Sequence, residues 1–215
     1  ADQFQGISVS PFEQSVSGDF TIKFDLWINF IGPFPDGGNG STQMASFGWG
    51  TSGFSPQWAA AKHSVLFAAS GDGGTLQDYR AYLVNLAPAA GAPIAPGSGV
   101  YAAGTDAEAL NATHPYYSSL GAVNAPQAQV DAYPTQTGST AVGSFGMEWH
   151  EIVIEKVGEN VSWFADDLRI GTVSLAGANL GGSNFFFGMF DINFASSTEQ
   201  NDFLNTAIFD NVRVE

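Results

Sequence analysis

The stretch FTIKFDLWINFI, residues Phe20–Ile31, decides the fold class. Its even-numbered positions are all apolar, whereas most of its odd-numbered positions carry Thr, Lys, Asp or Asn. Because successive side chains of a strand point to opposite faces, this period of two predicts a β-strand with one face in a core.

Further strands are predicted by the same criterion and by the turns between them. HSVLFAAS (63–70) and YRAYLVNL (79–86) flank the glycine-rich GDGGTLQD and predict a hairpin. Four later stretches also read as strands: WHEIVIEKV and VSWFADDLRIGTVSL around a turn at 158–160, the doubly apolar NFFFGMFDINF, and the final AIFDNVRV. We therefore predict one all-β domain over residues 1–215, a two-sheet antiparallel jelly-roll sandwich.

Residues 87–146 break this pattern and form a predicted irregular, loop-rich insertion. Thr105 and Glu108 have capping-box spacing, which predicts a short helix there. Between residues 81 and 147 only Asp106, Glu108 and Asp131 are charged. Loops lie on protein surfaces, and surfaces that meet a partner are depleted of charge. This segment is therefore expected to be covered by another copy of the chain or by a glycan layer.

The composition excludes several classes of partner and chemistry. Six Lys and Arg residues stand against 21 Asp and Glu, a net charge of −15, which disfavours nucleic acid and anionic membranes. No cysteine is present, so disulfides and thiolate chemistry are excluded. No stretch is long and apolar enough to span a membrane, and the chain begins Ala-Asp-Gln without an initiator Met. We expect a secreted, extracellular protein of a cell surface or matrix.

The C-terminal third carries a family resemblance. WHEIVIEKVGENVSWFADDLRIGTV (149–173) and the terminal FDNVRVE resemble the concanavalin A-like lectin/glucanase superfamily in its laminin G-like branch. The resemblance is looser over residues 19–32 and leaves 87–146 unmatched; the whole also resembles uncharacterised exported bacterial proteins. Asp166-Asp167 stands where that group has Asp-Gly. The resemblance implies a jelly-roll fold, and does not choose among lectin, hydrolase and structural protein.

Catalytic patterns are missing from the chain. The family's E-x-D-x-E run is absent, and Glu151 and Glu155 on one strand face stand about 13 Å apart, beyond the roughly 5–9.5 Å of glycosidase carboxylates. His63, His114 and His150 never pair at metal-ligand spacing, and His150 is interpreted as a strand residue with a local hydrogen bond. We predict that the protein is not an enzyme, with a glycoside hydrolase as the minor alternative.

A structural calcium ion is the cofactor that the sequence suggests. Asp210 alternates with Ile208, Val212 and Val214, which predicts that its carboxylate faces the core and needs donors or a cation. The candidate ligands are Asp210, Asp191, Asn193 and Asp202, and the resemblance implies calcium near this edge. Alternatively, backbone N–H groups satisfy Asp210.

Sugar binding and glycosylation have their own candidates. Exposed loop aromatics would provide the sugar platform: Trp49, Trp58, Tyr116, Tyr117 and Tyr133. Their alternative role is packing under the loops, the role assigned to the strand residues Trp27, Trp149 and Trp163. Asn39, Asn111 and Asn160 are possible glycosylation sites.

The N-terminal residues 1–12 suggest self-association. Phe4, Ile7 and Val9 make this segment apolar, so it is expected to pair with a sheet edge, either at home or on a neighbouring copy. Head-to-tail pairing that does not close gives a filament. The leading prediction is thus a non-catalytic, self-associating structural or adhesive protein; the alternative is a carbohydrate-binding, lectin-like module.

Overall fold

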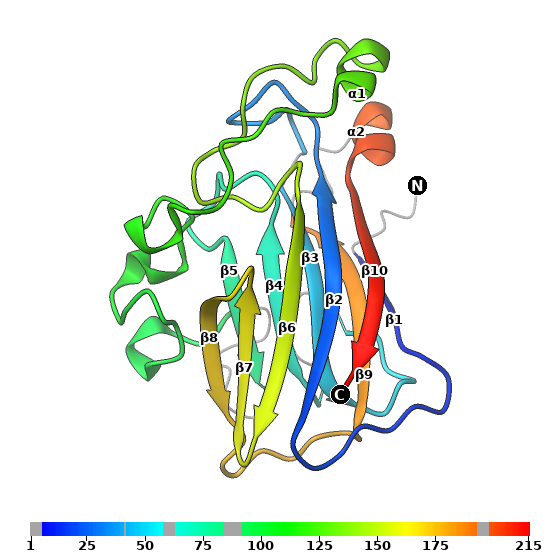
Figure 1. Cartoon of the computed structure of the whole chain (residues 1–215), viewed down its shortest axis with the longest axis vertical. Coiled ribbons are helices and arrows are strands. Elements are labelled where there is room, and N and C mark those ends of the chain that lie inside the picture. Colours follow the sequence, from blue (N-terminus) through cyan, green and yellow to red (C-terminus); the bar gives the residue numbers. More distant parts are fainter. Residues whose placement is uncertain (1–5, 41, 58–62, 84–91, 193–197) are drawn as a thin grey trace.

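Two antiparallel sheets packed face to face form a jelly-roll sandwich, as the sequence predicted (Figure 1). The computed structural model describes residues 6–40, 42–57, 63–83, 92–192 and 198–215. Sheet A has the order β1–β9–β3–β4–β5, formed by Gly6–Val9, Asn184–Asp191, Gln43–Thr51, Val65–Ser70 and Tyr79–Leu83. Sheet B has the order β10–β2–β6–β7–β8, formed by Thr206–Val214, Phe20–Asn29, Trp149–Val157, Asn160–Ala165 and Leu168–Ser174.

The core lies between the two sheets and is rich in aromatic rings. The even-numbered residues of β2 face it, and Phe24 has no exposed surface. Trp163 of β7 lies 5.2 Å from Phe47 of β3 and 5.5 Å from Phe67 of β4, measured between ring centroids. These rings join the sheets across the middle of the sandwich, and the alternation in Phe20–Ile31 is thereby confirmed.

Strands β3, β4 and β5 of sheet A are buried on both faces. Every side chain of β3, β4 and β5 is buried. The residues that point away from sheet B form a second apolar cluster, made of Met44, Leu66, Ala68, Tyr82, Phe186 and Phe190. The broad solvent-facing sheet surface is therefore the outer face of sheet B.

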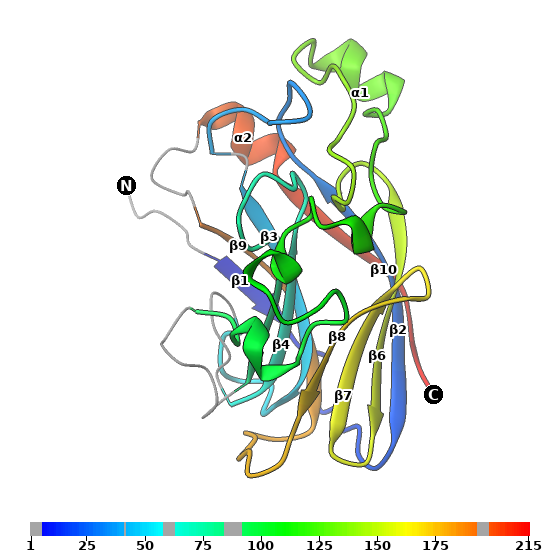
Figure 2. The ribbon, with the colours of Figure 1, turned by 90° about the vertical axis from the view of Figure 1, so that its left-hand side faces the viewer.

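The insertion contains only short helices over its described residues 92–146. These are η1 (Pro96–Ser98), η2 (Ala107–Leu110), η3 (Pro115–Tyr117) and α1 (Gln127–Ala132). Figure 2 shows the segment running along one side of the sandwich, with α1 beyond one end of the sheets. The helix expected after Thr105 is the single turn η2, and its N-cap is Asp106.

The insertion packs its large apolar side chains into the protein's own core. Val100, Tyr101, Leu110, Leu120 and Phe145 all belong to the main core cluster. Packing into the core thus accounts for part of the segment's low charge, and its covering by another copy of the chain or by a glycan layer stays a prediction.

The N-terminal segment forms an edge strand of its own chain. β1 pairs antiparallel with β9, with Gly6 opposite Phe190 and Val9 opposite Phe187. Phe4 lies outside the described residues. Of the two alternatives for this segment, the structure contains the edge strand that pairs within its own chain.

A further helix, α2 (Glu199–Leu204), precedes β10. No helix among the described residues is long and apolar enough to cross a membrane.

Candidate functional site

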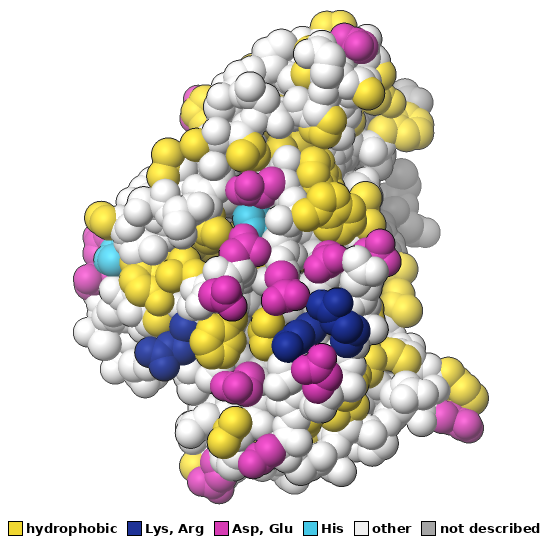
Figure 3. Space-filling view, viewed as in Figure 1, with side chains coloured by type: hydrophobic (Ala, Val, Ile, Leu, Met, Phe, Trp, Pro, Cys, Tyr) yellow, Lys and Arg dark blue, Asp and Glu magenta, His cyan; other side chains and the backbone are white. Residues whose placement is uncertain are grey.

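The outer face of sheet B carries three ordered rows of side chains. The strand register places Ile208 of β10, Trp27 of β2 and Trp149 of β6 side by side. The next row consists of Asp210, Asp25 and Glu151, and the row after it of Arg213, Lys23 and Val153. An apolar row thus borders an acidic one, and Figure 3 shows hydrophobic and acidic side chains gathered next to each other on this face.

The tryptophan pair is the most exposed large aromatic surface on a sheet face. Trp149 is 49% exposed, and its ring centroid lies 5.7 Å from that of Trp27, at an interplanar angle of 56°. Trp27 is half-buried and packs against the cluster of Phe30, Phe34 and neighbouring residues at the base of the insertion. Trp27 therefore packs against Trp149 and supports it, and Trp149 presents its ring to solvent. We call the surface formed by Trp27 and Trp149 the platform.

The acidic row is held by groups from β10. The side-chain amide of Asn211 donates to Asp25 at 2.6 Å, and its backbone N–H donates to Asp210 at 2.8 Å. Arg213 donates to Glu151 at 3.1 Å. Asn211 lies at a register shift of β10 and has a positive φ of 51°, which places its N–H and its amide on neighbouring carboxylates. The row is thus ordered by one basic side chain and one neutral one.

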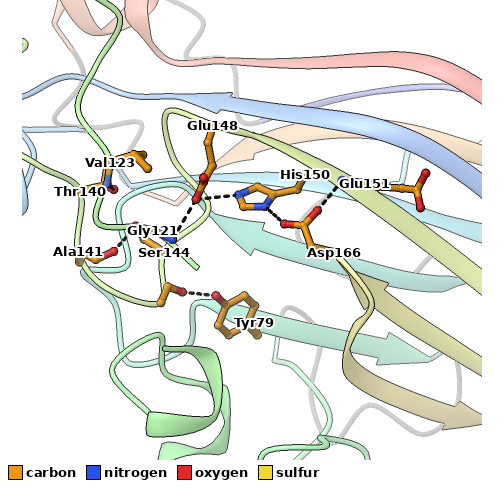
Figure 4. A network of polar contacts seen from close by, with 11 residues as sticks. Tyr79, Gly121, Val123, Thr140, Ala141, Ser144, Glu148, His150, Glu151 and Asp166 are labelled. Carbon is orange, nitrogen blue, oxygen red and sulfur yellow. Dashed lines mark hydrogen bonds and ion pairs between the residues drawn. The ribbon is translucent and has the colours of Figure 1, made fainter. Parts of the chain in front are cut away.

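A histidine network lies at the start of β6, on the core side of the strand (Figure 4). His150 is 1% exposed, stacks 4.5 Å from Phe145, and has its Nδ1 2.6 Å from a carboxylate oxygen of Asp166. The other oxygen of Asp166 accepts the backbone N–H of Glu151 at 2.8 Å. Burial raises the pKa of Asp166, but the hydrogen bond and charge of His150 and the Glu151 N–H outweigh it, so this pKa lies below its ordinary value. Asp166 is therefore the acceptor and Nδ1 the donor.

The Nε2 of His150 points toward Glu148. The distance from Nε2 to the Glu148 carboxylate is 3.7 Å, and Nε2 has no hydrogen-bond partner among the described residues. Glu148 also accepts the backbone N–H of Gly121 at 3.0 Å, so it ties the insertion to β6. The network joins three segments: β6, the insertion and the β7–β8 turn. In that turn Asp166 and Asp167 both have positive φ, 48° and 66°, as a two-residue hairpin of type I′ requires.

This network lacks the geometry of glycoside hydrolysis. Glycosidase carboxylates face each other across the bond that they cleave. Here the imidazole of His150, which is 1% exposed, lies between Glu148 and Asp166, so the two carboxylates do not face each other across an open space. The arrangement fixes the start of β6 behind Trp149.

A second acidic pair lies in the β4–β5 hairpin loop. Asp78 is 1% exposed and accepts hydrogen bonds from Ser70 (2.6 Å), Thr75 (3.1 Å from its N–H, 2.9 Å from its hydroxyl) and the Ala112 N–H (2.9 Å). Asp72 is 3% exposed and accepts the Gly74 N–H at 3.2 Å, and burial raises its pKa to about 6. Protein donors surround both groups, so this pair closes the loop and anchors the insertion.

The structure disperses the predicted sugar-binding residues. Trp49 belongs to β3 and not to a loop; it is 6% exposed, and its indole N–H contacts the carbonyls of Val16 and Ser183 at 2.9 and 3.0 Å. Tyr117 is fully buried, and its hydroxyl donates to the Ala109 carbonyl at 2.6 Å. The prediction that Trp49 and Tyr117 are exposed, sugar-binding loop residues was therefore wrong.

The other predicted aromatics do not form a common surface. Tyr116 is half-buried in η3 and donates to the Arg169 carbonyl at 2.8 Å, whereas the half-buried Tyr133 follows α1. Trp58 lies outside the described residues. Trp149 and Trp27, which had been assigned to packing, are the aromatic pair that faces solvent on the sheet. The available signal was Trp27 itself, a large ring on the polar side of the alternating strand.

Of the predicted calcium ligands, the structure describes the side chains of Asp210 and Asp191 and places them on different sheets, and calcium binding stays a prediction. Asp210 was predicted to face the core, but it is exposed on the outer face of sheet B, because Phe209 and Ala207 occupy the inward positions of β10. Asp191 ends β9 in sheet A, opposite Gln43. Asn193 and the side chain of Asp202 lie outside the described residues. Within the described ranges, no three His, Asp or Glu side chains are grouped to hold a metal ion.

The possible glycosylation sites differ in exposure. Asn39 and Asn160 are exposed, whereas Asn111 is half-buried and its amide oxygen accepts the N–H of Thr113 at 2.9 Å. Glycosylation of all three remains a prediction.

No protein-family model matches the chain, and a search of curated proteins gave no significant match. Among solved structures, the carbohydrate-binding module CBM66 from Bacillus subtilis is 13% identical, with a TM-score of 0.45, over 98% of this chain and 82% of that one. The alginate lyase AlgAT5 from polysaccharide lyase family 7 is 10% identical, with a TM-score of 0.42, over 98% of this chain and 62% of the lyase. An alginate lyase from Klebsiella pneumoniae is 10% identical, with a TM-score of 0.36, over 92% of this chain and 59% of the lyase. Likenesses this distant carry no argument about ligand or activity.

Proposed function

We propose that this protein is a non-catalytic carbohydrate-binding domain whose binding surface is the outer face of sheet B. The observation that carries the proposal is Trp149, a half-exposed indole on a strand, backed by Trp27 and bordered by hydrogen-bonding side chains.

The chemistry of this surface matches the two-sided chemistry of a sugar ring. The axial C–H groups of a pyranose form an apolar face that packs on an aromatic ring, and aromatic side chains are suited to contacts with one apolar and one polar side. The hydroxyl groups at the rim of the ring need acceptors and donors. Asp25 and Glu151 provide carboxylate oxygens in the row next to the tryptophans, two residues along each strand, and Arg213 provides N–H donors.

The platform is rigid, which lowers the entropic cost of binding. β6 lies between β2 and β7 in the middle of the sheet. Behind Trp149, the Glu148–His150–Asp166 network fixes the start of this strand. A sugar would therefore meet a preformed surface, and preorganisation of this kind raises affinity.

Titration calorimetry with matched variants tests the proposal. The intact protein is titrated with soluble oligosaccharides chosen from an insoluble-polysaccharide pull-down panel. Trp149→Ala is expected to weaken binding by about 1–2 kcal/mol, roughly 5- to 30-fold, because it removes the stacking surface. Phe54→Ala is the control, since Phe54 is 85% exposed and lies in the loop after β3. Equal affinities of the two variants would refute the platform, and release of new sugar ends during the titration would refute the non-catalytic assignment.

Self-association is a second candidate, favoured by a groove along the open edge of the sandwich. The groove has a volume of about 500 Å³, lies between β1, β9 and β10, and is lined by Ile7, Val9, Phe187, Gly188, Met189, Asn205, Thr206, Ala207 and Phe209. Ile7 and Val9 are 51% and 61% exposed. Exposed apolar side chains on an edge strand invite pairing with another chain.

Sedimentation velocity over a range of concentrations tests this second candidate. The variant Ile7→Ser/Val9→Ser is expected to sediment as a monomer where the parent protein forms larger species. Phe12→Ser serves as the control, because Phe12 is 75% exposed but does not line the groove. A parent protein that stays monomeric at every concentration would exclude a structural, filament-forming role.

A further inference from the structure

We infer that the sheet B platform selects an amine-bearing saccharide, such as a glucosamine oligomer, over neutral or acidic sugars. This inference rests on the proposed function and names the class of ligand for the same surface. It is carried by the charges that border the tryptophan pair.

The acidic row stands at a distance that suits a sugar substituent. Residues two apart on one strand face are separated by about 7 Å. Asp25 follows this spacing from Trp27, and Glu151 follows it from Trp149. An amino group on the ring stacked over Trp149, or on the next sugar along, therefore comes within reach of a carboxylate.

Much of the negative charge in this row has no counter-charge. Carboxylates directly opposite one another on neighbouring strands repel. Asp25 and Asp210 take hydrogen bonds from the neutral Asn211, and within the described part of the chain no basic group lies within ion-pair distance of either.

The two basic side chains of the next row pair with Glu215 and Glu151, and not with Asp25 or Asp210. Lys23 pairs with Glu215 at 3.2 Å, and Arg213 pairs with Glu151 at 3.1 Å. The face therefore keeps two carboxylates that a ligand cation would neutralise, and this charge complementarity identifies the occupant.

The platform suits an organic cation better than a metal ion. No group of three acidic or histidine side chains among the described residues is placed to hold a metal. An ammonium group beside an indole gains a cation–π attraction, and the sugar ring that carries it supplies C–H surface for Trp149. A uronic acid polymer would instead meet the acidic row and a chain of net charge −15.

The test compares three oligosaccharide series of equal length by titration calorimetry. Glucosamine oligomers, their neutral N-acetylated counterparts and acidic uronate oligomers are titrated at a mildly acidic pH that keeps the amine protonated. We expect the glucosamine series to bind tightest and the uronate series not to bind. The preference should shrink as salt is added, because exposed charges are screened.

Charge variants locate the preference on the acidic row. Asp25→Asn/Asp210→Asn is expected to weaken glucosamine binding by about fivefold for each charge removed, with N-acetylated binding unchanged. Asp36→Asn/Asp106→Asn is the matched control: it removes the same charge from two exposed loop residues and should preserve the preference.

The outcomes separate this inference from the proposed function. If both neutral and amine-bearing oligomers bind equally and depend on Trp149, the platform stands and the inference is overturned. If no oligomer shows a Trp149-dependent affinity, both fail. If the two charge variants weaken glucosamine binding equally, the attraction comes from the net charge of the protein, and the inference is again overturned.

Discussion

Replacing Asp72 by Asn should stabilise the protein at neutral pH and leave it unchanged in acid. Asp72 is a 3% exposed carboxyl in the β4–β5 loop, and burial raises its pKa from 3.8 to about 6. The nearby carboxylate of Asp78 contributes to this increase, and the Gly74 N–H opposes it, so the value of about 6 is the net result. Asn has the shape of Asp and keeps an oxygen for the Gly74 N–H, so the substitution removes the charge and retains the loop.

The sign and size of the effect follow from the two pKa values. Below pH 3.8 the Asp72 carboxyl is protonated in both the folded and the unfolded state, so it makes no difference. Between this value and about 6 only the folded state retains the proton, so the free energy of unfolding falls as the pH rises. Above that range the full cost is present. One pKa unit corresponds to about 1.4 kcal/mol, so the cost of the buried charge is about 3 kcal/mol. For a domain of this size, that corresponds to a rise of about 6–12 °C in Tm.

Urea denaturation followed by circular dichroism, at pH values on both sides of this window, measures the effect. We expect the gain from Asp72→Asn to be near zero in acid and to grow to its full value at neutral pH. Asp78→Asn is the contrasting control: an amide cannot accept from both the Ser70 hydroxyl and the Ala112 N–H on its two terminal atoms, so it should destabilise at neutral pH. A gain from Asp72→Asn that is the same at every pH would show that burial of a charge is not the cause.

Three further changes probe the core and the network behind the platform. Phe47→Ala should lower the free energy of unfolding by about 3–5 kcal/mol, measured by urea denaturation, because Phe47 is fully buried between the sheets. Gly48→Ala should lower the free energy of unfolding by about 1–3 kcal/mol in the same assay, since a Cβ there would lie 2.0 Å from a backbone oxygen of β4. Gly97→Ala is the control and should have a far smaller effect, because Gly97 has open space around it. Equal effects of the two substitutions would contradict the steric argument. Asp166→Asn should lower the free energy of unfolding at neutral pH by about 1 kcal/mol, seen as a lower Tm, because His150 loses its charged acceptor. This value is discounted for the exposure of the Asp166 side chain. Since the pKa of Asp166 is lowered, this difference should disappear as the pH falls below 3.8, and a Tm difference that persists there would count against the ion pair.

The fold was predictable because strand β2 has a clean alternation of apolar and polar residues. The even positions of Phe20–Ile31 are buried in the sandwich, and the β4–β5 hairpin lies where the glycine-rich turn indicated. Strand β3 was not predicted, because Gly48 and Gly50 give its second half the composition of a loop. Gly48 is required by the close approach of β4, which only the assembled sheet reveals.

The candidate site was only partly accessible from the sequence. The period-two pattern correctly placed Asp210 on the same strand face as Ile208, but it did not reveal that this face is the outer one. The contact of His150 with Asp166 depends on a hairpin turn, and its approach to Glu148 depends on the insertion. Such long-range contacts leave no local signal, so the platform and its support required the folded chain.

The separation of the tryptophans into buried and exposed classes gives the protein two internal fluorescent reporters. Trp163 lies among apolar rings, 6.0 Å from Tyr79, and should emit at short wavelength with energy received from that tyrosine. Trp149 is half-exposed and should emit further to the red. Loss of the sandwich would shift the blue component of Trp163, whereas a molecule bound over Trp149 would change the red component, so unfolding and ligand binding are distinguishable in one spectrum without any label.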